Sequence, residues 1–573
     1  MHNDIMEDKK EIKSLKRSAR MQSMIRLLLM LVILISANII SAFVFSRFDL
    51  TGEKRYSLSP STKEELKKMN DVMYVKIYLD GDLPPSFKRL RNSVKELLDE
   101  FRVYAKDNIE YEFVDPSVSS VKKERDELFK QLYKKGLQPT NLEERNNGSS
   151  SQMVIWPGAV VNFMGREAPI NFLQTKIGSG TEENINRSVE GLEYEFMNAL
   201  RIFGTGIRPK VGFLQGQAEL GTKQLSDAAR ALSDYYEVDT VKIDGQLNSL
   251  KNYKAIIIAK PDSVFDEKDK FILDQYIMNG GRVLWLVETM QMNMDSLQVA
   301  ESSVAIAKDI NILDQLFHYG VRINDDLALD LQAAPIPLVT GMVGNQPQQS
   351  LFPWYFFPLL NPTSNHPIVH NLNAIKCEFA STMDTVEAPG ISKTVLLSTS
   401  KFSKSLLSPV RVSLNMLKED PDPTYFSQQY LPVAVLLEGK FQSVFHSRVP
   451  EEIKNNKDIA FKDSGVQNKM IVISDGDMIA NYVSKKGNIY PLGYDRFTNQ
   501  TYGNRNFILN CVDYLCDNEN IVSLRGKEFK IRLLDPAKSK EKIYSWVAMV
   551  LPLVMVLLYG MIHFYIRRRK YAS

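Results

Sequence analysis

The residues best suited to chemistry stand directly after a predicted buried strand, Lys469 to Ile473. Ser474, Asp475 and Asp477 follow this strand in the run Ser-Asp-Gly-Asp. Doubly wound sheets hold ligands beyond the carboxyl ends of their strands, and carboxylates there suit a metal ion or a sugar hydroxyl. The same carboxylates also suit helix capping, because they accept hydrogen bonds from the first N–H groups of a helix. We favour capping, and these three residues are the main candidates for binding a small ligand.

A second candidate is the glycine turn from Gly216 to Lys223, Gly-Gln-Ala-Glu-Leu-Gly-Thr-Lys. It follows a predicted strand and opens a helix, as a phosphate-binding loop does. The lysine comes one place too late for that motif, and no Ser or Thr follows it to hold magnesium. We therefore expect a turn into a helix rather than a nucleotide site, and we keep Gln217 and Glu219 as candidate ligand contacts.

Other catalytic patterns are weak or missing from the sequence. His366 and His370 have the spacing of two metal ligands on one helical face, but Pro367 lies between them and no third ligand is evident. The three cysteines form neither a disulfide framework nor a zinc-binding pattern. No Gly-x-Ser-x-Gly or Gly-x-Cys-x-Gly motif occurs, so a hydrolase or amidotransferase with an exposed nucleophile is not indicated. We predict a protein that is not an enzyme, without cofactor or metal.

Prolines and aromatic residues interrupt the pattern of strands and helices from about Ala333 to Pro362. The aromatic cluster comprises Phe352, Trp354, Tyr355, Phe356 and Phe357. This cluster either forms the lip of a site for an apolar or sugar-like ligand or packs against a sheet. We favour packing because large exposed apolar patches are uncommon, and we keep Trp354 as a candidate ligand contact. The segment of about 333–430 is predicted to be an insertion in an α/β domain.

The elements that position these residues alternate as in an α/β protein. The clearest unit begins with the apolar strand Tyr253 to Ala259, continues through a helix from Asp266 to Met278, and ends with the strand Arg282 to Val287. Gly280-Gly281 supplies the end of the helix, and the second strand returns parallel to the first. Residues 206–535 are therefore predicted to form a doubly wound domain of the flavodoxin or class I amidotransferase kind.

A second α/β domain is predicted over residues 47–205. Its elements read strand, helix, strand, helix, then a polar loop over 139–151, three strands and a closing helix from Thr181 to Phe203. This order resembles a thioredoxin-like domain. The Cys-x-x-Cys motif of thioredoxin chemistry is missing, so we expect the fold without its redox activity.

Two long uncharged runs lie near the ends of the chain. They cover 20 residues at 27–46 and 24 residues at 543–566. As helices, both match the hydrocarbon core of a bilayer, which is about 30 Å thick. Basic clusters flank them at 1–26 and 567–573, and basic flanks stay in the cytoplasm. We predict a bacterial inner-membrane protein with two transmembrane helices, cytoplasmic termini and a periplasmic body.

The charge distribution excludes one class of function. The chain of 573 residues has a net charge of +3, while its basic ends contribute +3 and +4. The body between the ends is therefore slightly acidic and lacks the basic footprint that binds DNA or RNA. With 44% apolar and 24% charged residues, the composition is that of a folded protein.

The predicted membrane helices carry features that indicate a neighbouring helix. Ala37, Asn38, Ser41 and Ala42 form a strip of small residues around a single amide, and an amide in lipid needs a partner. Pro552 lies near the middle of the second helix and frees a backbone carbonyl. We expect these residues to pack against a separate multi-span membrane subunit.

Several stretches together resemble the auxiliary, substrate-binding-like subunits of ABC transporters. They are residues 254–287, Ile471 to Asp477, Pro491 to Phe507 and the basic tail after residue 566. More narrowly, the chain is similar to the GldG family of gliding-motility proteins of Bacteroidota. Relatives often show Gly-His-Gly-Glu where this chain has Gly216-Gln217-Ala218-Glu219, so a role tied to that histidine does not carry over.

The resemblance implies partners and a role. The partners are an ABC permease and, through it, a cytoplasmic ATPase, in a complex linked to gliding motility. We predict a non-enzymatic accessory subunit. The alternatives are a structural periplasmic scaffold of an envelope secretion or motility machine that binds no small ligand, and a membrane-tethered hydrolase, which needs a clustered nucleophile or a metal site.

Overall fold

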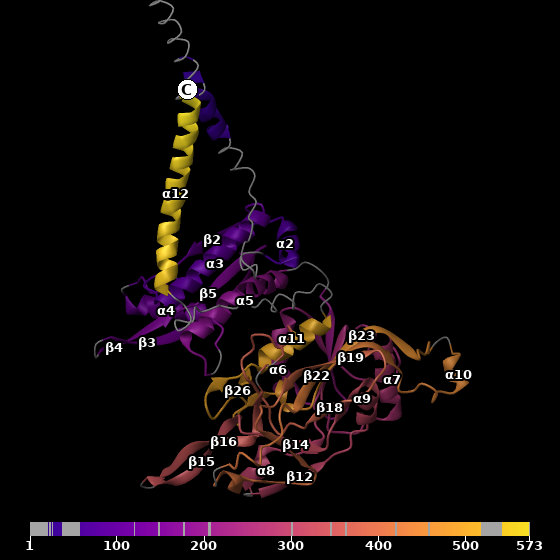
Figure 1. Cartoon of the computed structure of the whole chain (residues 1–573). Helices are drawn as coiled ribbons and strands as arrows, with labels where there is room; N and C mark the ends of the chain where they lie inside the picture. The colour runs from indigo at the N-terminus through magenta and orange to yellow at the C-terminus, as the bar shows by residue number, and fades with distance from the viewer. Residues whose placement is uncertain are drawn as a thin grey trace, which may run out of the picture. The chain divides into compact units, whose positions relative to one another are not determined.

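The computed structural model describes residues 21, 24, 25, 27–36, 58–516 and 541–571 (Figure 1). Within 58–516 the gaps are residues 120, 147–148, 176–177, 204–207, 300–301, 344–345, 361, 363, 419–420 and 457–458. The chain divides into two units, one formed by Met1–Ser57 and Phe529–Ser573, and the other by Leu58–Glu528. The second unit holds all the described strands.

The unit at the chain ends contains one described helix that is long and apolar enough to cross a membrane. Helix α12 runs from Glu541 to Tyr571 with Pro552 inside it, and its segment Met549–Ile566 has a mean hydropathy of 2.1. The described apolar helix near the N-terminus, Leu27–Ser36, is shorter. A span over 27–46 stays a prediction, and the predicted packing residues Ala37, Asn38, Ser41 and Ala42 lie outside the described residues.

The first sheet belongs to residues 58–203. Its strand order is β2-β1-β5-β6, with β1 parallel to β2 and antiparallel to β5, and β5 antiparallel to β6. The strands are β1 Met73–Ile77, β2 Ile109–Phe113, β5 Gly158–Phe163 and β6 Arg166–Asn171, and the helices are α2 Pro60–Lys67, α3 Pro85–Tyr104, α4 Lys122–Lys134 and α5 Thr181–Ile202. Helices α3 and α5 share one apolar core with β1 and β5, while Leu132 of α4 packs with Val160 in another. The sheet is therefore covered on both faces.

The prediction of a polar loop over residues 139–151 is wrong. Strands β3 Thr140–Asn146 and β4 Ser149–Ile155 form an antiparallel hairpin there. Most of its residues are polar, so it lacks the alternation of apolar and polar side chains that identifies a half-buried strand. The signal that the sequence did carry is Asn147-Gly148, a dipeptide typical of hairpin turns.

The second sheet has seven strands in the order β19-β22-β23-β10-β9-β7-β8. Five of them, from β8 to β23, are parallel, and β22 and β19 continue the sheet in antiparallel pairing. The strands are β7 Lys210–Leu214, β8 Glu237–Val241, β9 Ala255–Ala259, β10 Arg282–Leu286, β19 Ile391–Ser398, β22 Pro432–Gln442 and β23 Ser464–Ile473. In chain order the five parallel strands lie 2-1-3-4-5, and ligands of such sheets bind at the carboxyl ends of the strands.

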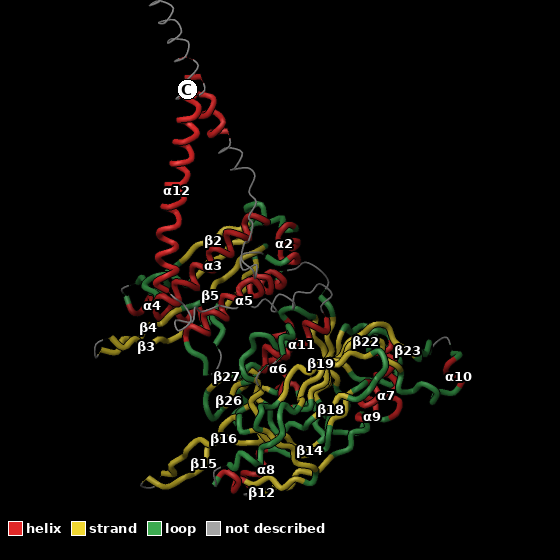
Figure 2. Tube along the Cα trace, viewed as in Figure 1, coloured by secondary structure: helices red, strands yellow, loops and turns green. Residues whose placement is uncertain are grey.

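Helices cover both faces of this sheet (Figures 1 and 2). Helices α6 Thr222–Ser233 and α11 Asn504–Cys516 pack on one face, and α7 Glu267–Met278 and α9 Leu313–Tyr319 pack on the other. Strand β9 explains the division, because Ala255 and Ile257 point into the first core while Ile256 and Ile258 point into the second. A strand that is apolar on both faces suits the centre of a parallel sheet.

The predicted insertion has more regular structure than its prolines indicate. Its main feature is a long antiparallel hairpin of β15 Ala333–Val343 and β16 Gln346–Leu360. The smaller elements of this region and of the C-terminal end of the unit are β11 Met290–Gln291, α8 Met294–Val299, β12 Ser302–Ala307, β13 Val321–Ile323, β14 Asp326–Asp330, β17 Ile375–Lys376, β18 Met383–Thr385, β20 Ser403–Leu407, β21 Val410–Ser413, η1 Leu414–Leu417, α10 Glu451–Lys454, η2 Asp477–Ile479, β24 Asn481–Val483, β25 Ile489–Leu492, β26 Tyr494–Asp495 and β27 Gln500–Thr501.

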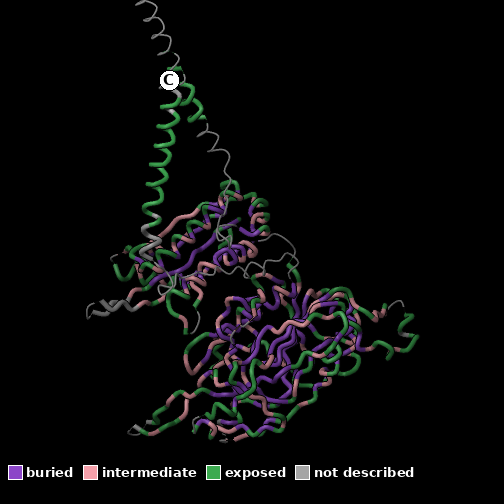
Figure 3. Tube along the Cα trace, viewed as in Figure 1, coloured by how far each residue is buried: buried purple, intermediate pink, exposed green. Residues whose placement is uncertain are grey.

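The aromatic cluster of the insertion packs into a core of its own. Figure 3 marks the buried residues of this unit in purple along its central strands. Trp354 and Phe356 have no exposed surface, and Phe357 is 1% exposed. The structure confirms the prediction that these aromatic side chains pack in the protein interior. Trp354 is fully covered by protein, so it offers no surface to a ligand.

Candidate functional site

Four loops meet at the carboxyl edge of the parallel sheet because β7, β9, β10 and β23 run in the same direction. The loop after β9 begins with Lys260, the loop after β10 contains Glu288, and the loop after β23 is Ser474 to Asp477. The carboxylates of Glu288, Asp475 and Asp477 have oxygens within 4.8 Å of one another. We call Lys260, Glu288, Asp475 and Asp477 the carboxyl-edge cluster.

Lys260 neutralises part of this cluster. Its Nζ lies 2.6 Å from Oδ2 of Asp477 and 3.1 Å from Oε1 of Glu288. Gly476 makes the approach possible, since a Cβ at this glycine would lie 2.6 Å from Cβ of Lys260. The glycine between the two aspartates therefore serves close packing against the lysine side chain.

Asp475 is fully buried and serves the backbone. Its Oδ2 accepts a hydrogen bond from the N–H of Glu378, and its Oδ1 accepts from the N–H groups of Asp477 and Met478. The last two bonds cap the short helix η2, as the capping interpretation predicted. The bond to Glu378 also fastens the chain after β17 to the sheet edge.

Burial dominates the electrostatics of the cluster. It raises the pKa of Asp475 to about 7, and the neighbouring charge of Asp477 acts in the same direction. Burial, with the charge of Asp477, also raises the pKa of Glu288 well above its usual range. Burial alone would lower the pKa of the Lys260 ammonium group. The carboxylates of Asp477 and Glu288 have the larger effect and raise this pKa. The cluster thus holds one firm cation, and its buried carboxyl groups, Asp475 and Glu288, bind protons more tightly than exposed carboxyl groups do.

This arrangement limits the chemistry of the site. Carboxylate oxygens suit a hard cation, but the ammonium group of Lys260 already contacts two of the three carboxylates. The lysine therefore provides the positive charge that a metal ion would bring. A buried ion pair of this kind is typical of a structural anchor, and a proton is the ligand that it exchanges most readily.

Ser474 is not placed as a nucleophile. Its side chain is fully buried, and its hydroxyl donates to the carbonyl oxygens of Ser381 and Val433 at 2.6 and 3.2 Å. Cys377 is also fully buried, and burial raises the pKa of its thiol. Neither group is available to attack a substrate.

The glycine turn after β7 is closed by its own side chains. Oε2 of Glu219 accepts from the N–H groups of Gly216 and Gln217 at 2.8 and 2.9 Å. The Nε2 of Gln217 donates to Asp269, and its backbone oxygen accepts from the loop after β9. Burial raises the pKa of Glu219. A carboxylate here occupies the N–H groups that a phosphate would need, in agreement with the expected turn.

The histidine pair serves the backbone and an aromatic contact. Nδ1 of His366 accepts from the N–H of Ile368 at 3.3 Å, and its ring packs against Tyr514 at 5.0 Å between centroids. The N–H of His370 donates to the carbonyl of His366. The segment is a turn, as expected from Pro367.

Sequence reasoning missed Lys260 and Glu288. Both follow strands that the sequence identified, β9 and β10, by one and two residues. The signal was available, because the residues after neighbouring parallel strands converge on one edge of the sheet. The sequence pattern pointed only to the Ser-Asp-Gly-Asp run after β23, because three of its four residues are polar.

Comparisons with known proteins identify the family of the sheet domain. The family model for an ABC-type uncharacterized transport system matches residues 208–511. A model for a domain of unknown function matches residues 52–162. An uncharacterized protein of Borreliella burgdorferi is 21% identical over 566 residues, which cover 95% of this chain and 97% of the relative.

Two solved structures are similar to part of the chain. The mmIFT52 N-terminal domain covers 54% of this chain and 98% of its own length, with 14% identity and a TM-score of 0.31. A putative ThuA-like protein from Parabacteroides merdae covers 54% of this chain and 90% of its own, with 9% identity and a TM-score of 0.25. Both scores are too low to indicate a shared overall fold. The family match spans more than half of the sequence, and on that ground the chain belongs to the family of ABC-type uncharacterized transport systems.

Proposed function

We propose that this protein is a non-enzymatic, membrane-anchored accessory subunit of an ABC-type transport system. The observation that carries the proposal is the family match over residues 208–511. The proposed partners are a multi-span permease and, through it, a cytoplasmic ATPase. The family description supports transport, and the presence of a long apolar helix in the same chain supports attachment to a membrane.

The proposed location is a bacterial inner membrane, with both termini in the cytoplasm and residues 47–542 in the periplasm. Helix α12 supports one anchor, since its apolar segment Met549–Ile566 is followed by Arg567, Arg568, Arg569 and Lys570. Basic residues after a span favour a cytoplasmic end. The second anchor rests on the uncharged run at 27–46.

The chemistry of the carboxyl-edge cluster supports a binding or structural role. The acidic groups are neutralised by Lys260 and by backbone N–H groups, and the hydroxyl of Ser474 faces carbonyl oxygens. An enzyme of the hydrolase class needs a nucleophile that a substrate reaches. We therefore propose that the cluster does not catalyse hydrolysis. On this proposal the energy for transport comes from the partner ATPase.

We also propose that the first sheet is thioredoxin-like and that the second is flavodoxin-like, as the sequence predicted. The parallel order of β8, β7, β9, β10 and β23 supports the second assignment. The proposed domain limits are 47–205 and 206–535, with the insertion at about 333–430.

A link to gliding motility is the narrowest part of the proposal. It rests on the resemblance to GldG proteins, of which the run Pro491 to Phe507 is the most specific part. In the structure this run braces the sheet domain: Asn504 bonds to the backbone of Lys376 in both directions, at 3.0 and 2.8 Å, and to the oxygen of Met478 at 3.2 Å. Deletion of the gene in a gliding bacterium that carries it tests this part, and unchanged spreading of colonies would remove it.

Purification from native membranes tests the proposal as a whole. The full chain with an affinity tag is extracted in mild detergent, and an unrelated single-span protein with the same tag serves as the control. We expect a multi-span permease and an ATP-binding protein to elute with the chain and not with the control. Elution of the chain alone would favour the scaffold alternative.

A further inference from the structure

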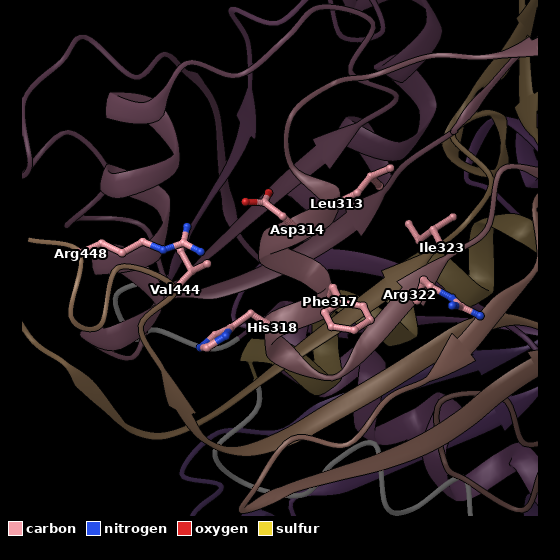
Figure 4. Close-up of a pocket in the computed structure, with 8 residues that line it drawn as sticks. All are labelled: Leu313, Asp314, Phe317, His318, Arg322, Ile323, Val444 and Arg448. Atoms are coloured by element: carbon pink, nitrogen blue, oxygen red, sulfur yellow. The ribbon is translucent and has the colours of Figure 1, made fainter.

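A cavity of about 460 Å³ lies away from the carboxyl-edge cluster, between helix α9 and the turn that follows β22 (Figure 4). It is lined by Leu313, Asp314, Phe317, His318, Arg322, Ile323, Val444 and Arg448. Pockets for small ligands have volumes of about 300–1,000 Å³. Apolar and polar residues contribute equally to the lining, so the cavity suits a ligand with both kinds of surface.

One buried carboxylate fixes both walls of the cavity. Oδ1 of Asp274 accepts from the hydroxyl of Tyr319 in α9 at 2.8 Å and from the N–H of Val444 at 3.0 Å. Its Oδ2 accepts from the hydroxyl of Ser443 at 2.7 Å and from Gln275 at 2.9 Å. Asp274 has no exposed surface. The walls therefore keep their separation when no ligand is present, which lowers the cost of binding.

Two of the charges at the cavity are already matched. Nζ of Lys270, whose side chain is 3% exposed, lies 2.8 and 2.9 Å from the two oxygens of Asp314. Arg322 forms an ion pair with Asp384 at 2.5 Å. These pairs leave Arg448 as the remaining guanidinium group of the cavity.

Arg448 is the cation that lacks an anion. Its side chain lies at the surface, and the described residues provide no ion pair for it. In Figure 4 Arg448 and His318 lie on one side of the cavity, Arg322 lies on the other, and the ring of Phe317 is between them. Phe317 is 51% exposed. A guanidinium and an exposed aromatic ring that line the same cavity suit a planar carboxylate attached to an apolar group.

We propose that this cavity binds a carboxylate carried on an apolar group, with the carboxylate on Arg448 and the apolar group against Phe317 and Val444. The site is separate from the proposed transport role, and failure of the membrane purification leaves it standing. The same chemistry has two sources, a free small carboxylic acid and the C-terminal residue of a peptide. Arg448 is the specificity-determining residue in either case.

Calorimetric titration of the full chain in detergent tests the site. The probes are 3-phenylpropionate, its neutral amide, a tetrapeptide ending in a free phenylalanine carboxylate, and the same peptide as a C-terminal amide. We expect at least one carboxylate probe to bind and both amides to fail. Binding of the free acid identifies a small-molecule site, and binding of the peptide alone identifies a peptide-end site.

The variants separate the site from uptake of the probe by detergent. Arg448→Gln is expected to weaken carboxylate binding by roughly tenfold or more, because charged hydrogen bonds are lost. Arg411→Gln is the matched control, since Arg411 is an exposed arginine of β21 outside the cavity, and it is expected to bind as the wild type does. Absence of binding by both carboxylates, or equal binding by Arg448→Gln, overturns the proposal. A thermal melt of each variant checks that the fold is intact.

Discussion

Replacement of Lys260 by methionine is expected to destabilise the sheet domain strongly. The substitution keeps most of the apolar stem but removes the ammonium group that lies 2.6 Å from Asp477 and 3.1 Å from Glu288. The side chain of Glu288 is 5% exposed and that of Asp477 is 26% exposed. Removal of one partner of a buried ion pair costs about 3–5 kcal/mol. Because Lys260 and Asp477 are partly exposed, we expect the lower end, about 3 kcal/mol at pH 8.

Two further variants make this prediction specific. Glu288→Gln in the Lys260→Met background removes a buried carboxylate that has lost its cation, so the double variant is expected to be more stable than Lys260→Met. Lowering the pH from 8 to 5 is expected to recover part of the loss in Lys260→Met, because Asp475, whose pKa is raised to about 7, takes up a proton. Calcium is expected to raise the melting temperature of Lys260→Ala and not that of the wild type, since a cation then has access to three carboxylates.

Urea unfolding of the full chain in detergent, followed by tryptophan fluorescence, measures these differences. A loss below about 1 kcal/mol for Lys260→Met, the value expected of an exposed ion pair, would contradict the reasoning. A double variant that is less stable than the single one would also contradict it, because the lysine would then act through packing rather than charge.

The remaining predictions concern the same sheet edge and its brace. The pKa of Asp475 is raised to about 7 in the folded protein, so the folded state binds the proton of this group more tightly than the unfolded state does. The stability that this group contributes is therefore lost as the pH rises from about 4 to 7. Urea unfolding at several pH values checks this dependence, and Asp475→Asn is expected to flatten it. Gly476→Ala is expected to lower the melting temperature because its Cβ would meet Lys260. Gly341→Ala serves as the control and is expected to change the melting temperature little, since its Cβ would be 3.7 Å from the end of a glutamine side chain. Asn504→Ala leaves the N–H of Lys376 without its acceptor and is expected to cost about 2 kcal/mol, and a loss under 0.5 kcal/mol in urea unfolding would argue against the bracing role.

The parallel part of the second sheet could be predicted well from the sequence. Strand β9 is apolar throughout, and the glycine pair after α7 marks the end of that helix, where Gly280 has φ of +92°. Such signals are local: an apolar run for a buried strand, a glycine for a left-handed helix end. They predicted helix α7 and strand β10 to within one residue at each end.

The elements that were missed lack the local residue pattern of a strand. The hairpin β3–β4 is made mostly of polar residues, and β15–β16 contains five prolines that normally argue against strands. Both hairpins form because each strand pairs with the strand that follows it directly in the chain. Lys260 and Glu288 were missed for a different reason, since only the alignment of β9, β10 and β23 in the sheet brings them to Asp477.

The cavity beside α9 could not be inferred from the sequence at all. Phe317 and Arg448 are separated by more than a hundred residues, and they come together because Asp274 binds both walls. A single aspartate within a mostly buried helix carries no signal of this role.

The mass of the native complex tests the central claim most directly. The full chain has a mass of 65.4 kDa, and an accessory subunit of a transport system is expected to leave the membrane in a larger particle that also contains a permease and an ATP-binding protein in fixed ratio. Native mass spectrometry of the detergent-extracted, tagged chain measures this ratio. A particle of 65.4 kDa, or a simple multiple of it with no other protein, would contradict the account.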